Sequence, residues 1–116
     1  MVSLIFNKES VLNLLEGDIE LFCELATLAE SETSSMLIKL HEASEIKNKK
    51  DITYYAHTMR SALANLGADK CCDTLLLLEE AAEEDQAEQV KSLLKTLVAD
   101  LDQYFKEVQA FEDEQG

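Results

Sequence analysis

The stretch VKSLLKTLVADLDQYFKEVQAF, residues 90–111, decides the fold class. Its apolar residues recur alternately every four and every three positions, at Val90, Leu94, Leu97, Leu101, Tyr104, Val108 and Phe111. This is the spacing of one face of an amphipathic α-helix that packs against other helices. The stretch therefore predicts a long helix with one face in a core.

Upstream of this helix, apolar spacing and end signals predict two further helices and a loop. A short helix over about 8–16 has Asn7 as its N-cap and stops at Gly17. Asp18 caps a helix over 19–45, whose apolar or small positions are Ile19, Phe22, Ala26, Ala29, Thr33, Leu37 and Leu40. The polar segment 47–51 predicts a loop that ends with Asp51 as the next N-cap.

Two more helices complete the predicted fold. One ends at Gly67 as a left-handed C-cap and carries the stripe Ile52, Tyr55, Ala56, Met59, Leu63 and Leu66. The next, about 69–84, is predicted to bury Cys72, Leu75, Leu78 or Glu79, and Ala82. The four longer helices predict an all-α, antiparallel four-helix bundle with the short first helix over one end. The length of 116 residues predicts a single domain, 1–116.

Composition excludes several partners. Ten Lys or Arg against 24 Asp or Glu give a formal charge of −14, which repels nucleic acid and anionic membrane surfaces. The apolar run near the N-terminus is too short for a signal peptide or a membrane span, so we expect a cytoplasmic monomer. Cys23, Cys71 and Cys72 show no zinc or redox spacing, which predicts reduced residues in the core or at its edge.

One face of the third predicted helix carries polar and small residues beside the apolar stripe: Thr53, His57, Arg60, Ser61 and Ala64. Neutral imidazole is a nucleophile near neutral pH, and its Nε2 can accept a phosphoryl group when Nδ1 holds the proton. A guanidinium one turn away can pair with the phosphoryl oxygens. This face is therefore the candidate site for phosphoryl chemistry.

The segment AHTMRSALANLGA, residues 56–68, followed by LEEAAE, residues 78–83, resembles the histidine phosphotransfer (HPt) domain. The matching positions are Ala56, His57, Thr58, Ala62, Leu66, Gly67, Ala68, Leu78 and Glu79. The opening FNKESVLNLLEGDIELF, residues 6–22, also resembles the entry of such domains. Arg60 stands where the family usually has lysine, and Ser61 where it usually has glycine.

The resemblance implies a phosphocarrier of two-component phosphorelays and not a kinase. His57 would take a phosphoryl group from the aspartyl phosphate of one receiver domain and pass it to another. Arg60 would supply the counter-charge, and Glu79 would orient the ring. The implied partners are response-regulator receiver domains and a hybrid sensor histidine kinase. No cofactor or metal is implied for this chain, since Mg²⁺ would belong to the receiver.

Several alternatives stay open at this point. Glu79 can equally be an ordinary solvated glutamate that does not orient the ring. Arg60 can be the partner of a surface carboxylate instead of a phosphoryl counter-charge. Tyr54 fits either the core or a docking surface, on which Ser61 and Ala64 would leave space for a receiver. The departures at Arg60 and Ser61 also fit a helical adaptor that docks to a signalling partner without phosphotransfer. The chain can be free-standing or the cytoplasmic domain of a membrane sensor kinase.

Two reaction classes are excluded from the residues alone. An ATP-dependent kinase needs Gly-rich phosphate-binding loops, which two internal glycines do not provide. A di-metal carboxylate bundle needs Glu-x-x-His pairs, and neither His41 nor His57 has a Glu three residues before it. We interpret His41 as a surface residue.

Overall fold

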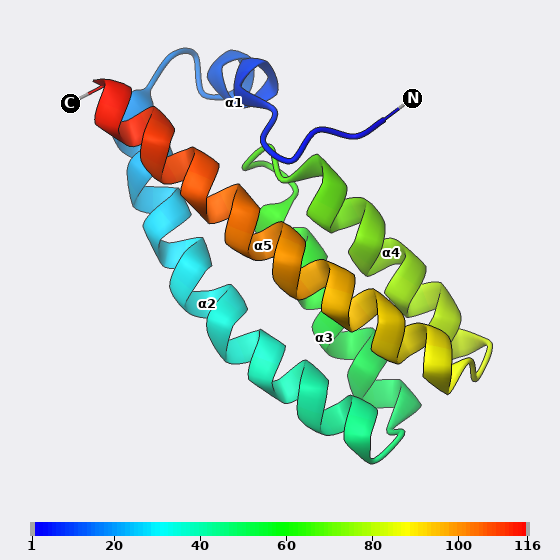
Figure 1. Ribbon diagram of the computed structural model, residues 1–116. Helices are drawn as coiled ribbons and strands as arrows, with labels where there is room; N and C mark the ends of the chain where they lie inside the picture. Colours follow the sequence, from blue (N-terminus) through cyan, green and yellow to red (C-terminus); the bar gives the residue numbers. More distant parts are fainter. Residues whose placement is uncertain (1, 116) are drawn as a thin grey trace.

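Helices form nearly the whole chain in the computed structural model, which describes residues 2–115. In chain order they are α1 (Lys8–Leu14), α2 (Ile19–Glu45), α3 (Lys49–Leu63), α4 (Asp69–Glu83) and α5 (Ala87–Gln115). Helices α2 to α5 run alternately up and down in a bundle, and α1 lies over the end where α5 finishes (Figure 1). The prediction of an all-α, antiparallel four-helix bundle is confirmed.

The core follows the apolar spacing of the helices. All seven periodic positions of α5, from Val90 to Phe111, are buried. On α2 the predicted positions are buried except Ile19 and Leu37, which are partly exposed and pack against the core. Within residues 2–115, no helix is both long and apolar enough to cross a membrane.

The start of α3 differs from the prediction. The helix begins at Lys49, and its N-cap is Asn48 instead of Asp51. The Asn48 side chain accepts a hydrogen bond from the Asp51 backbone N–H (3.1 Å) and donates one to the Asp51 carboxylate (2.9 Å). The amide thus satisfies an unpaired N–H of the first turn, while Asp51 lies inside that turn, where a negative charge favours the helix N-terminus.

Two smaller predictions were also wrong. Helix α1 ends at Leu14, not at 16, because Glu16 and Gly17 both have positive φ angles of 53° and 80°. On α4 it is Cys71 that is completely buried, while Cys72 is only partly buried. Cys71 is one turn before Leu75, so it continues the buried stripe of that helix.

The turn between α3 and α4 packs against the N-terminal segment, residues 2–7. Gly67 has a φ of 71°, and its carbonyl accepts a hydrogen bond from the Asn7 N–H (2.8 Å). The Lys70 N–H donates to the Leu4 carbonyl (3.0 Å). Phe6 then enters the core, where its ring stacks on Phe22 at a centroid distance of 5.6 Å. The end of the bundle is therefore closed by a non-helical segment.

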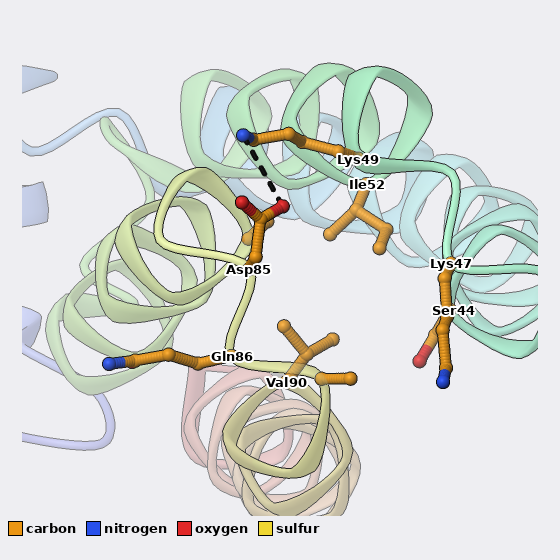
Figure 2. A pocket seen from close by; sticks show the side chains of 9 residues that line it. Ser44, Lys47, Lys49, Ile52, Asp85, Gln86 and Val90 are labelled. Carbon is orange, nitrogen blue, oxygen red and sulfur yellow. Dashed lines mark ion pairs between the residues drawn. The ribbon is translucent and has the colours of Figure 1, made fainter.

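The opposite end of the bundle brings together the α2–α3 and α4–α5 connections (Figure 2). A small hollow there has Ile52 and Val90 in its floor. Lys49 Nζ lies 3.4 Å from Asp85 Oδ1 across it. Both side chains are well exposed, so this ion pair contributes little to stability.

Substitution of Gly67 by alanine should destabilise the protein more than the same change at Gly17. Both glycines have positive φ, which costs an alanine about 1–2 kcal/mol. An added Cβ at Gly67 would also lie 2.7 Å from the Asn7 carbonyl oxygen and 2.8 Å from Val11 Cγ2, whereas at Gly17 it would meet nothing within 4 Å. We expect Gly67→Ala to lose about 1–3 kcal/mol beyond Gly17→Ala in urea unfolding. Equal losses of unfolding free energy would show that the N-terminal segment moves without cost to make room for the added methyl group.

Candidate phosphoryl-acceptor site

His57 lies in the middle of α3 and points away from the core. Its side chain is 61% exposed, so one ring nitrogen can be reached from solvent. The helix presents it because the core stripe of α3 (Ile52, Ala56, Met59 and Leu63) occupies the opposite side. The ring is therefore open to a macromolecular partner without any movement of the backbone.

Two charged side chains flank the Nδ1 atom of His57. Arg60 Nη2 is in hydrogen-bond contact with Nδ1 at 3.1 Å. Glu79 Oε1 lies 3.4 Å from the same atom. Arg60 Nε donates to Glu79 Oε2 at 2.8 Å, so the three side chains form one chain of contacts. The structure thus brings together the three residues that the sequence predicted for the reaction.

The Arg60–Glu79 pair joins α3 to α4. The Glu79 side chain is 13% exposed and that of Arg60 is 33% exposed, so the pair is partly desolvated. The hydrogen bond to Glu79 raises the pKa of Arg60 further above its ordinary value, which keeps the guanidinium charged. Arg60 pairs with a carboxylate, as the simpler interpretation expected, and it also contacts the imidazole.

The three predicted docking residues are all exposed, and they lie around His57. Tyr54 is 61% exposed, so it lies at the surface and not in the core, and its ring packs edge-on against Tyr55 at a centroid distance of 5.1 Å. Ser61 lines a groove between α2 and α3. Ala64 lines a hollow on the α4 side together with Arg60. None of the three takes part in the contacts of the imidazole.

No protein-family model matches the sequence, and no curated protein matches it. Among solved structures, the chain is similar to histidine-containing phosphotransfer protein B from Pseudomonas aeruginosa PAO1, with a TM-score of 0.81 and 17% sequence identity. The similarity covers 94% of this chain and 98% of that one. The chain has the HPt fold. At this level of identity the likeness concerns the fold alone.

Exposed leucines near the site were missed in the sequence. Leu25 and Leu28 of α2 line the groove that contains Ser61, and Leu76 of α4 lines the hollow that contains Arg60. In this HPt fold they place apolar surface on both sides of α3. Leu21, Leu25 and Leu28 are spaced by four and three residues beside the core stripe of α2, and this spacing is a signal for a second apolar face.

Cys71 is a core residue, whereas Cys23 and Cys72 are partly buried. Burial raises the pKa of Cys71 to about 12 and that of Cys72 to about 11. The Cys72 thiol lies 3.8 Å from the Arg60 carbonyl oxygen, close to the candidate site. Among residues 2–115 there is no group of three or more His, Cys, Asp or Glu placed to hold a metal ion.

Neither Cys71 nor Cys72 should react with iodoacetamide in the folded protein. At pH 8 a free thiol is about one quarter ionised, whereas a thiol of pKa about 11 is only ~0.1% ionised, and the thiolate is the nucleophile. Mass spectrometry of native and urea-unfolded samples should show labelling of both cysteines only after unfolding. Half-exposed Cys23 is the internal comparison. Rapid native labelling of Cys72 would contradict the raised pKa of this partly buried thiol.

Proposed function

We propose that the chain is a histidine phosphotransfer protein that accepts a phosphoryl group on His57 from a receiver-domain aspartyl phosphate and relays it to a second receiver. The observation that supports this most strongly is an exposed imidazole in the middle of a helix of the HPt fold, with a cation and a carboxylate beside Nδ1. Transfer of phosphoryl groups needs a nucleophile, a counter-charge and an orienting group, and these three side chains fit those roles.

The transfer is a displacement at phosphorus. The lone pair of Nε2 forms the new P–N bond while the P–O bond to the receiver aspartate breaks, and the aspartate leaves as a carboxylate with that electron pair. In the reacting state Glu79, whose Oε1 lies 3.4 Å from Nδ1, would accept the Nδ1–H and so orient the ring. Arg60 pairs with the phosphoryl oxygens, for which a forked guanidinium is well suited. The same steps in reverse, with a second receiver, release the group.

The remaining features of the proposal follow from this role. The chain acts as a phosphocarrier and not as an ATP-dependent kinase, and Mg²⁺ belongs to the receiver domains. We place it in the cytoplasm as one monomeric HPt domain, with response-regulator receivers and a hybrid sensor kinase as partners. Tyr54, Ser61 and Ala64 form the docking face, together with the exposed leucines on either side of α3.

Phosphorylation should depend on His57 and not on His41. Purified receiver domains from the same organism, charged with acetyl phosphate, serve as donors. Wild type and His41→Gln should acquire an acid-labile, base-stable phosphate, while His57→Gln should stay at background. His41 is the matched control because it is the other histidine of the chain and is also exposed. Equal labelling of His57→Gln would overturn the assignment.

The α2 side of the docking face can be tested with a matched pair of substitutions. Leu28 is 56% exposed and lines the groove beside Ser61, whereas Ile38 of the same helix is 61% exposed and is not among the residues of that groove. Leu28→Asp should weaken receiver binding about tenfold, because a carboxylate placed in an apolar contact loses its hydration without gaining a partner. Calorimetric titration should show unchanged affinity for Ile38→Asp. A similar loss of affinity for both variants would show that this groove is not the receiver-binding surface.

A second candidate function is favoured by the Arg60 contact with Nδ1, which competes with the hydrogen bond that Glu79 would make. In this alternative the chain is an adaptor that docks to a receiver and does not carry phosphate. Wild type would then bind receivers without being labelled, and the pair Arg60→Lys and Ser61→Gly would restore labelling. Phosphate labelling of the wild-type protein would exclude the adaptor function.

A further inference from the structure

The hydrogen bond to Nδ1 determines where the neutral His57 ring carries its proton. Among residues 2–115, Arg60 Nη2 is the only hydrogen-bond partner of the ring, at 3.1 Å. A guanidinium has donors and no acceptor, so Nδ1 must contribute its lone pair to this contact. A neutral imidazole has one N–H and one lone-pair nitrogen. With Nδ1 as the acceptor, the proton lies on Nε2.

This arrangement is opposite to the one that the reaction needs. Attack on phosphorus from Nε2 requires a lone pair on that atom, and hence a proton on Nδ1. Glu79 Oε1 faces Nδ1 at 3.4 Å and would accept that proton once Arg60 had moved away. Arg60 and Glu79 therefore favour different tautomers of the same ring, and in this structure Arg60 holds the shorter contact.

The geometry of Arg60 explains how it keeps this position. Its Nε is held by Glu79 Oε2 at 2.8 Å, while Nη2 of the same planar group reaches His57. A lysine has a single nitrogen in place of this fork and cannot hold both contacts in the same way. The hollow lined by Arg60, Ala64 and Leu76 adjoins the guanidinium, so there is room for it to turn.

We propose that Arg60 is a positioning residue that keeps resting His57 in the Nε2–H tautomer and releases it when a phosphoryl group arrives. The inference rests on the proposed phosphotransfer function and adds a control step to it. The dianionic phosphoryl group draws the guanidinium away from Nδ1, so counter-charge and release are supplied by one movement. Unphosphorylated His57 is then a weak nucleophile toward reagents that carry no such charge.

The change of tautomer neither consumes nor releases a proton overall. The ring gives its Nε2 proton to solvent water and takes one from solvent at Nδ1, so no net proton is gained. Nε2 then has the lone pair that forms the P–N bond, and the electron pair of the breaking P–O bond leaves with the receiver aspartate. The Nδ1–H donates to Glu79 Oε1, whose negative charge stabilises the positive charge that develops on the ring.

Nitrogen NMR of the unphosphorylated, ¹⁵N-labelled protein reads the tautomer directly. At about pH 8.5, where free imidazole is neutral, His57 should carry its proton on Nε2. In Arg60→Met the proton should move to Nδ1, because Glu79 is then the remaining partner. Arg60→Lys keeps a cation beside Glu79 and should show the same move if the methionine variant does not fold. Thr53→Val, one turn before His57 and outside these contacts, should match wild type.

The reaction of His57 with a neutral acylating reagent gives a second test of the tautomer. Such a reagent carries no negative charge that could draw Arg60 away from the ring. Diethyl pyrocarbonate attacks a lone-pair ring nitrogen, so wild-type His57 should react more slowly than exposed His41 in the same sample. Arg60→Met should raise the His57 rate on the order of tenfold, since loss of a charge-assisted hydrogen bond shifts an equilibrium by about that factor. Peptide mass spectrometry follows both histidines.

A wild-type Nδ1–H tautomer, or an unchanged tautomer and acylation rate in both Arg60 variants, would overturn the proposal. Both measurements use protein without donor or receiver, so they are independent of whether His57 is phosphorylated in the relay. Labelling of His57→Gln by a charged receiver would instead overturn the proposed function while leaving the tautomer result intact.

Discussion

The turn at Gly67 sets the register of α3 against α4, and the site depends on that register. Its left-handed backbone reverses the chain within a few residues after Leu63, and the Asn7 carbonyl and Val11 leave no space for a side chain there. The two helices consequently lie antiparallel and in contact. This places Glu79, twelve residues beyond the turn, opposite His57, which lies ten residues before it. A shift of one residue in the turn would rotate the carboxylate away from the imidazole.

Much of the fold could be predicted because helical periodicity is a local signal. The seven buried positions of α5 and the left-handed Gly67 follow from residue spacing and backbone sterics. The N-cap of α3 was missed because Asn48 and Asp51 are both good caps. The Asn48 side chain takes that position, where it accepts from the Asp51 backbone N–H and donates to the Asp51 carboxylate. Phe6 could not be placed, since its burial depends on rings that α2 and α5 bring together from distant parts of the sequence.

At the candidate site, the helix face that presents His57 and Arg60 could be predicted from the sequence, whereas the contacts among His57, Arg60 and Glu79 could not. The spacing of His57 and Arg60 by one turn follows from the helix alone. Whether Arg60 meets the carboxylate, the imidazole or both depends on the distance between two helices and on the planar shape of its side chain. The exchange of lysine for arginine looks conservative in charge, yet it adds a second nitrogen that reaches the ring. The sequence therefore predicts which side chains lie near His57 better than it predicts how Arg60 and Glu79 contact the ring.

The N-terminal segment has an additional consequence for Arg60. Ser3, which is hydrogen-bonded to Asp73 on α4, forms part of the wall of the hollow that adjoins Arg60. The free volume into which the guanidinium can turn is thus bounded partly by the N-terminal segment, residues 2–7. Anything that lifts this segment from α4 would enlarge that volume and alter the conformational entropy of Arg60. The conformational freedom of Arg60 thus depends on how closely the N-terminal segment packs against α4.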